Sequence, residues 1–208
     1  MERMTIKEFK EESNIEVIES IMKMNNGYVT SKELDNFGIH RMYLNSMWKK
    51  GLVEKAAPGI YIDINKIEDN YYVFNLSMPN TIYSHMTALY FHGLSIKAPN
   101  EKYDITVRKT YNSKHLKNHE VFYVSDDIYE LGLTEVKTPM GNNVRVYDVE
   151  RCICDIIRSK NRMDSEHIKY SIKEYIKRKD KDLVKLSNYA KEMGIKEEVM
   201  NYIEVFYE

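Results

Sequence analysis

The 208-residue sequence predicts an α+β protein: an N-terminal winged helix-turn-helix followed by an α+β domain with a small mixed sheet and C-terminal helices. Three observations predict it. Residues 13–64 follow the order helix, helix, helix and β-hairpin, which is the order of a winged helix. Short β-branched or aromatic segments follow between residues 103 and 147. Residues 165–207 then show helical patterns. We expect two domains, residues 13–64 and residues 75–208.

Each element of the first domain has its own signal. Apolar residues at helical spacing predict the first helix: Ile15, Ile18, Ile21 and Met22. This helix should end at Gly27, which suits a left-handed cap. A hydroxyl at Thr30, with Glu33 three residues later, predicts a capping box at the start of the second helix. The third helix should span residues 39–50, and Pro58–Gly59 should turn the hairpin.

The third helix is the candidate recognition helix. We expect its inward residues to be Ile39, Leu44, Met47 and Trp48. Residues 39–55 hold four basic residues against one acidic residue, a local excess that phosphate binding requires. Such a helix fits the major groove of double-stranded DNA, the expected partner. The predicted DNA-binding residues are Thr30, Ser31, His40, Arg41, Tyr43, Asn45, Lys49, Lys50 and Lys55. A winged helix can also serve as a protein-interaction module, and that alternative stays open.

The second domain should begin with a helix over residues 81–90, capped near Thr81. Four segments read as strands: residues 103–107, 121–124, 134–138 and 144–147. Asp148 should cap a helix over residues 149–158, in which Arg151 and Asp155 can pair at i,i+4 spacing. Gly194 should divide the C-terminal helices.

Three segments together resemble one known family. Residues 27–62 are similar to the N-terminal winged helix of AbiEi antitoxins, with Leu44, Met47 and Gly51 at the expected places. Residues 84–94, SHMTALYFHGL, resemble the family's S-H-x-S-A-L-x-x-H-G-L segment. Residues 146–155 resemble its V-x-D-x-E-R-T-x-x-D segment, with Cys152 where threonine is common.

The resemblance implies a transcriptional repressor of its own toxin–antitoxin operon, acting in abortive infection as a phage defence. It further implies an operator with repeats and antitoxin activity against a nucleotidyltransferase-like toxin, which the antitoxin need not contact directly. No cofactor is expected, and no enzymatic activity.

A Mg²⁺-dependent, restriction-type nuclease is the alternative of another class. Asp126 or Asp127, followed by Glu135 and Lys137, gives the order of two carboxylates and a lysine that is typical of such a site. We expect the acidic pair to lie in a loop. His85 and His92 are seven residues apart, whereas a helical zinc site prefers i,i+4 spacing and needs a third ligand, so we expect structural histidines and no metal.

The C-terminal helices carry a basic segment, with 11 basic against five acidic residues over 158–191. Lys169, Lys173 and Lys177 follow at i, i+4 and i+8 and form one stripe, which Arg178 extends. We expect an antitoxin-domain surface that contacts phosphate or opposes the toxin; the alternative is a solvated helix face. The charged N-terminus and the lack of a long apolar run predict a cytoplasmic protein without a membrane partner.

Overall fold

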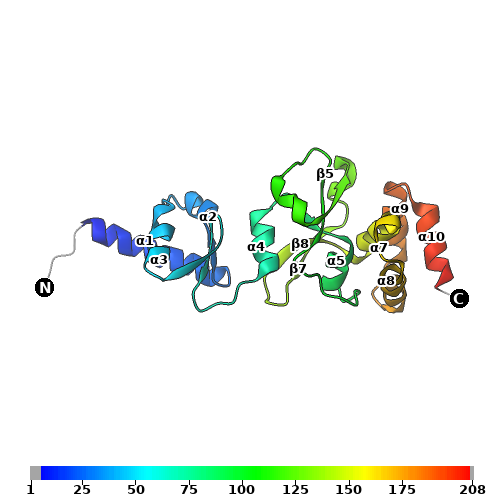
Figure 1. The fold of residues 1–208 in the computed structure, drawn as a ribbon, viewed down its shortest axis with the longest axis horizontal. Coiled ribbons are helices and arrows are strands. Elements are labelled where there is room, and N and C mark those ends of the chain that lie inside the picture. Colours follow the sequence, from blue (N-terminus) through cyan, green and yellow to red (C-terminus); the bar gives the residue numbers. More distant parts are fainter. Residues whose placement is uncertain (1–5, 207–208) are drawn as a thin grey trace. The chain divides into compact units, whose positions relative to one another are not determined.

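The computed structural model describes residues 6–206, and for residues 6–12 the backbone alone. The chain divides into two compact units between Met78 and Pro79 (Figure 1). Helices and two small sheets confirm the predicted α+β class. Each unit is described by itself below.

The N-terminal unit is a winged helix. Its elements are α1 (Ile6–Met24), β1 (Tyr28–Thr30), α2 (Ser31–Asn36), α3 (Met42–Lys49), β2 (Val53–Ala57) and β3 (Ile60–Asp63). The antiparallel sheet has the order β1-β3-β2, so β3 lies in the middle and β2 with β3 forms the wing. One core joins the three helices to the sheet, and it includes Ile18, Leu34, Leu44 and Met47. The apolar residues of the first helix therefore face the core, as their spacing predicts.

The capping box of α2 is confirmed. The Thr30 side chain accepts a hydrogen bond from the Glu33 amide over 3.1 Å, and the Glu33 carboxylate accepts one from the Thr30 amide over 2.8 Å. At the wing, Gly59 has a φ of 77°, the left-handed value that the predicted turn requires.

Two predictions about the third helix are wrong. It begins at Met42 and not at residue 39, because the Ile39 amide still donates to the Leu34 carbonyl and closes the preceding helix. Trp48 does not point inward, since 47% of its surface is exposed. Leu44 and Met47 fill the buried face, and the next position is turned by about 100° around the helix axis.

Helix α4 (Asn70–Ser77) lies beyond residue 64, where the sequence predicted the winged helix to end. It packs against the wing strands, and Val73 joins Tyr28, Ile60 and Ile62 in a second small core. Asp69 caps the helix, and its amide donates to the Tyr28 hydroxyl over 2.7 Å.

The C-terminal unit is built on a five-stranded mixed sheet with the order β6-β5-β4-β8-β7. The strands are β4 (Ile82–Tyr83), β5 (Asp104–Arg108), β6 (Glu120–Val124), β7 (Leu133–Lys137) and β8 (Asn143–Tyr147). The helices are α5 (His85–Phe91), α6 (Asp126–Tyr129), α7 (Val149–Arg158), α8 (Ser165–Lys177), α9 (Leu183–Glu192) and α10 (Lys196–Val205), with short 3₁₀ helices η1 (Lys114–Asn118) and η2 (Lys160–Arg162).

The predicted helix over residues 81–90 is wrong in its first part. Ile82 and Tyr83 form β4, which pairs with β5 on one side and with β8 on the other. Pairing on both sides outweighs the local preference for helix, and α5 begins only at His85 with Ser84 as its N-cap. Asp126 and Asp127 do not lie in a loop, because they open the short helix α6.

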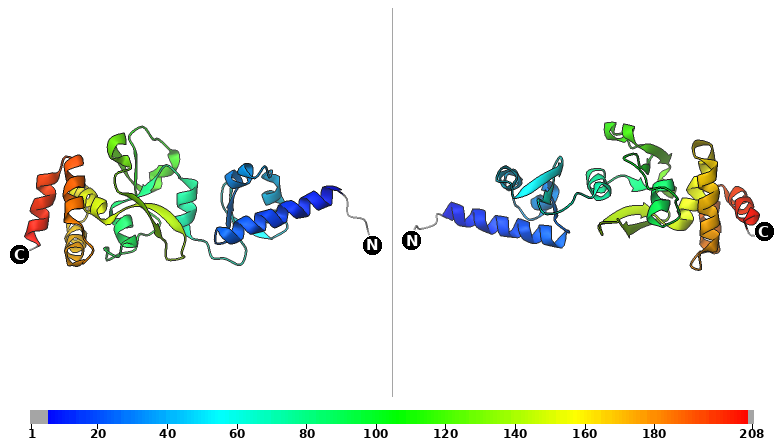
Figure 2. Two further views of the ribbon diagram at one scale, coloured as in Figure 1. Left: turned by 180° about the vertical axis from the view of Figure 1, so that it is seen from behind. Right: turned by 60° about the horizontal axis from the view of Figure 1, so that its bottom comes forward.

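Helix α7 is the centre of the C-terminal unit. Its residues from Val149 to Ile157 are all buried, and it contacts α5, α8, α9 and α10. Figures 1 and 2 agree in placing α8, α9 and α10 beside α7, away from β7 and β8. Gly194 separates α9 from α10 as predicted, with a φ of 70°.

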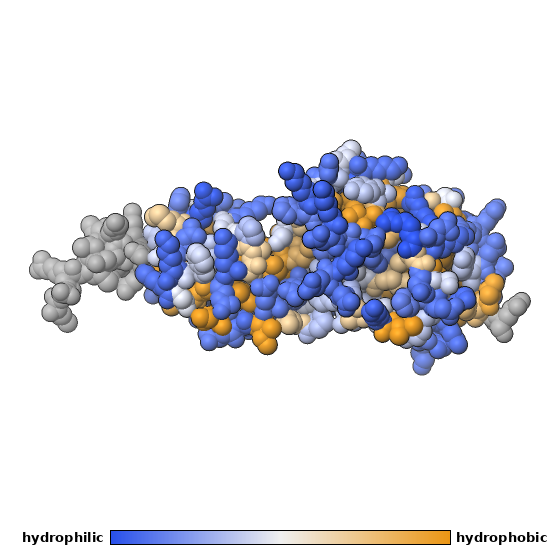
Figure 3. Space-filling model, viewed as in Figure 1, coloured by the Kyte–Doolittle hydropathy of each residue, from blue (hydrophilic) through white to orange (hydrophobic). Residues whose placement is uncertain are grey.

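The face drawn in Figure 3 is mostly polar. Hydrophilic residues cover most of the face seen in Figure 3, and hydrophobic ones lie between them in small groups. Within residues 6–206, none of the helices combines the length and the apolar character needed to cross a bilayer.

Candidate nucleic-acid interface

The basic residues of the third helix lie on its exposed side. Arg41 precedes α3 and is exposed, and Lys49 and Lys50 are exposed at its end. His40 is also exposed, and its Nδ1 accepts a hydrogen bond from the Met42 amide over 3.2 Å. This contact fixes the entry into α3 and leaves Arg41 at the N-terminal end, where recognition helices place the residues that read bases.

Two of the predicted contacts are engaged inside the unit. Tyr43 does not face outward, because it is half-buried against the core. Asn45 is exposed, and its Oδ1 accepts a hydrogen bond from the buried Tyr61 hydroxyl over 2.8 Å. The wing thus sets the orientation of the Asn45 amide relative to the helix.

The two hydroxyl residues at the start of α2, Thr30 and Ser31, have different hydrogen-bond partners. Thr30 is occupied by the capping box, and its hydroxyl also donates to the Glu33 carboxylate over 2.9 Å. Ser31 is half-buried, and its amide donates to the Gly59 carbonyl over 2.8 Å. The start of α2 is therefore tied to the turn of the wing.

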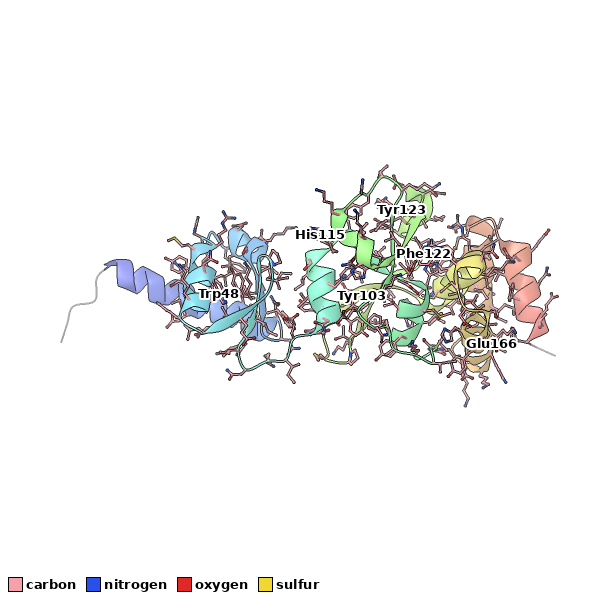
Figure 4. All side chains as sticks on the ribbon, in the orientation of Figure 1. Trp48, Tyr103, His115, Phe122, Tyr123 and Glu166 are labelled. Atoms are coloured by element: carbon pink, nitrogen blue, oxygen red, sulfur yellow. The ribbon has the colours of Figure 1, made fainter. Side chains whose placement is uncertain are left out.

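Trp48 is an interface candidate that the sequence reasoning missed. The Lys55 ammonium on β2 lies 6.0 Å from the centre of the Trp48 ring, within the range of a cation–π contact. Met42, on the same helix, and Phe37, before it, are also exposed. Figure 4 labels Trp48 on α3. The sequence holds no signal for this exposure, because the helical position of Trp48 predicts burial and only the packed fold leaves it exposed.

In the C-terminal unit the basic stripe is partly neutralised. Lys169 pairs with Glu166 over 2.9 Å, and Lys177 pairs with Glu174 over 2.6 Å. Arg178 follows α8 and pairs with Asp180 over 2.6 Å. Within residues 6–206, Lys173 is exposed and takes part in no ion pair. These contacts are at the surface, where ion pairs are weak and exchange readily with other partners.

The two histidines of the family-like segment have structural partners. Both ring nitrogens of His85 are used, Nδ1 with the Ser84 hydroxyl at 2.8 Å and Nε2 with the Ser159 hydroxyl at 3.0 Å. Nε2 of His92 donates to the Tyr147 carbonyl over 2.7 Å. Burial lowers the pKa of both rings. Among the described residues, no cluster of three His, Cys, Asp or Glu side chains could hold a metal ion.

The nuclease arrangement is not assembled in the sheet. Asp126 follows β6 and pairs with Arg108 over 3.1 Å, at the end of β5. Glu135 and Lys137 lie on β7, and β6 and β7 are the opposite edges of the sheet. In the register of β7 with β8, Glu135 stands opposite Arg145.

Together, the winged helix and the exposed basic residues of α3 form a surface that is suited to contact DNA phosphates. Residues 17–62, within the winged helix, match the family model described as "Transcriptional regulator, AbiEi antitoxin". The match confirms, over the winged helix, the resemblance predicted from the sequence. A search of curated proteins finds no match.

A solved structure extends the likeness to the rest of the fold. The chain is similar to the crystal structure of the RV2827C protein from Mycobacterium tuberculosis, with a TM-score of 0.55 and 10% sequence identity. The similarity covers 90% of this chain and 79% of that chain. At this identity the likeness concerns the fold alone.

Proposed function

We propose that this protein represses its own toxin–antitoxin operon by binding operator DNA with α3 and the β2–β3 wing. The observation that carries the proposal is the exposed basic side of α3, in a segment that matches the regulator family. Arg41, at the N-terminal end of α3, is suited to read a guanine, while Lys49 and Lys55 are suited to phosphate contacts. An operator with repeats would place one winged helix on each repeat.

A gel shift on the protein's own promoter tests the proposal. Arg41→Ala should weaken binding by about 1–3 kcal/mol if it reads a base. Lys49→Ala should weaken binding to all sequences and reduce its salt dependence. Lys23→Ala, which removes an exposed charge from α1, is the matched control and should bind like the wild type. Unchanged affinity in both Arg41→Ala and Lys49→Ala would overturn the assignment of α3.

We further propose that the C-terminal unit protects cells against a nucleotidyltransferase-like toxin, without a need for direct contact. The support is the resemblance of residues 84–94 and 146–155 to segments of the antitoxin family, together with the exposed stripe on α8. The full chain carrying Arg41→Ala and Lys49→Ala, expressed from a foreign promoter, should still rescue cells from the toxin. If rescue disappears together with operator binding, the protein protects cells only by repressing the operon.

The stripe itself is tested by charge reversal. Lys169→Glu, Lys173→Glu and Lys177→Glu together should reduce rescue, while exposed positions of this kind change stability by only about 0.5 kcal/mol each. The control is Lys191→Glu, on the exposed side of α9. Full rescue by the triple variant would show that the stripe is a solvated face.

We expect no enzymatic activity, because the matched family is one of regulators and the candidate nuclease residues lie on opposite sheet edges. Purified protein incubated with Mg²⁺ or Mn²⁺ should leave plasmid DNA and RNA intact. Cleavage that is lost in Glu135→Ala would contradict this expectation.

A further inference from the structure

A pocket of about 310 Å³ opens in the C-terminal unit between the edge strand β6, the start of α5 and the end of α7. This volume is at the lower end of the range for small-molecule sites. Its principal lining residues are His85, Phe122, Tyr123, Asp155, Arg158 and Arg162. Figure 4 labels Phe122 and Tyr123 on β6.

Asp155 supplies an unpaired acceptor in the wall of the pocket. Only 3% of its surface is exposed, and its Oδ1 accepts a hydrogen bond from Nε of Arg151 over 3.1 Å. Its Oδ2 is buried and has no hydrogen-bond partner within residues 6–206. A buried acceptor without a donor costs about 1–3 kcal/mol, so the pocket favours an occupant that carries a hydroxyl or amine.

Two arginines line the same pocket. Arg158 is exposed at the end of α7, and its side chain takes part in no hydrogen bond or ion pair in the part of the chain that the structure describes. Arg162 lies on η2, with its guanidinium carbon 4.2 Å from the centre of the Phe122 ring. Both Nη atoms of Arg162 donate to the Val121 carbonyl over 3.3 Å, and Nη2 also pairs with Glu120 over 3.2 Å at the surface. The pocket is therefore suited to an anion, held by the charge-assisted hydrogen bonds that arginine forms with phosphate.

His85 is held in a strained conformation beside these groups. Its φ of 47° is left-handed, which is uncommon for residues other than glycine and is often found at functional sites. Its ring stacks on Phe122 with 3.4 Å between centroids, and the hydroxyls of Ser84 and Ser159 fix both nitrogens. The imidazole is thus a rigid part of the wall that positions Phe122 and the Ser159 hydroxyl.

We propose that this pocket binds a small phosphate ester with a free hydroxyl group, of the size of a nucleoside monophosphate. Arg158 would hold the phosphate, Arg162 would join it by giving up its surface contact with Glu120, and the hydroxyl would reach the buried Oδ2 of Asp155 through a small movement of the pocket wall. Tyr123 lines the pocket and is half exposed, so its ring offers a stacking surface for a base. Inorganic phosphate lacks a sugar hydroxyl at a distance from the phosphate, and adenosine lacks the phosphate. The inference stands apart from DNA binding, because every group in it belongs to the C-terminal unit.

Calorimetric titration of the full-length protein at low salt, without DNA, tests the pocket with four probes. Adenosine 5′-monophosphate and ribose 5-phosphate should bind, inorganic phosphate should bind about tenfold more weakly, and adenosine should not bind detectably. Tighter binding of the nucleotide than of the sugar phosphate, lost in Tyr123→Ala, would identify the base as part of the ligand. Equal binding of the two would identify a sugar phosphate.

The variants locate the site. Arg158→Ala should weaken the nucleotide about tenfold or more, and Arg158→Lys should restore part of the affinity. Lys191→Ala removes an exposed charge from α9 and should bind like the wild type. The urea midpoint of each variant shows that it is folded. The proposal is overturned if neither phosphate ester binds at millimolar concentration, if Arg158→Ala binds like the wild type, or if inorganic phosphate binds as tightly as the esters.

Discussion

Arg151 and Asp155, one turn apart on α7, form a buried ion pair in which Nε of Arg151 donates to Oδ1 of Asp155 over 3.1 Å. Nη1 of Arg151 donates in addition to the carbonyls of Ile128 and Leu131, over 2.6 and 2.9 Å. The Arg151 side chain therefore connects the central helix to α6 and to the turn that follows it. Its guanidinium also lies 4.3 Å from the centre of the Tyr147 ring. Arg151, within the family-like residues 146–155, therefore has a structural role in the C-terminal unit.

Asp155→Ala should lower the free energy of unfolding by about 3 kcal/mol or more, because it leaves the fully buried Arg151 charge without its partner. The measurement is urea unfolding followed by circular dichroism. Glu166→Ala is the control, since it breaks an exposed ion pair with Lys169 and should leave the midpoint nearly unchanged. Equal midpoints for the two variants would contradict a stabilising role of the buried pair.

Gly132→Ala should destabilise the C-terminal unit by about 2 kcal/mol or more, through backbone strain and a steric clash. Gly132 has a φ of 75°, and an added Cβ would lie 2.7 Å from the Cβ of Arg151. Gly141→Ala is the matched control, because Gly141 has a φ of 87° but no atom within 4 Å of an added Cβ. It should carry only the backbone cost, about 1 kcal/mol. Equal losses of stability in thermal unfolding would show that the contact between the added Cβ and Arg151 does not destabilise the unit.

Asp104 should make stability depend on pH. Burial raises the pKa of its carboxyl to about 6, and the negative charge of Glu120 acts in the same direction, against the Met86 amide, Arg162 and Lys102. Because the folded pKa lies above the unfolded value of about 3.9, the folded protein binds the proton more tightly. The stabilising contribution is therefore full below about pH 4 and is lost as the pH rises through about 6.

Asp104→Asn should remove this dependence. Relative to the wild type, the variant should gain about 1–3 kcal/mol in free energy of unfolding between pH 4 and pH 7, measured in urea. A difference between variant and wild type that stays constant over this range would contradict the raised pKa.

The sequence predicted the winged helix better than the domain that follows it. Local signals, such as the Thr30–Glu33 capping box and the glycine at position 59 of the wing, determine their elements without distant partners. The strand Ile82–Tyr83 could not be predicted in this way, because its partners Thr106, Ile105 and Val146 are distant in sequence.

The candidate sites show the same limit. The exposed side of α3 follows from helical spacing, but the exposure of Trp48 depends on how much of the core Leu44 and Met47 already fill. The pocket beside Asp155 joins α5, β6, α7 and η2. No spacing along the chain reveals that Arg158 and Phe122 line one cavity.

Trp48 should report DNA binding directly, because it is the chain's only tryptophan and 47% of its surface is exposed. If α3 enters the major groove, the indole leaves water and its contact with Lys55 changes, so its emission should shift and change intensity. Titration of the protein with its promoter duplex, with excitation at the indole band, measures this change.

The midpoint of this titration should move to higher DNA concentration as salt increases, since phosphate contacts release counterions. Arg41→Ala should need more DNA for the same change, whereas Lys23→Ala should follow the wild type. Unchanged emission under conditions where a gel shift shows full binding would mean that DNA is held by another surface, and α3 would lose its role as recognition helix.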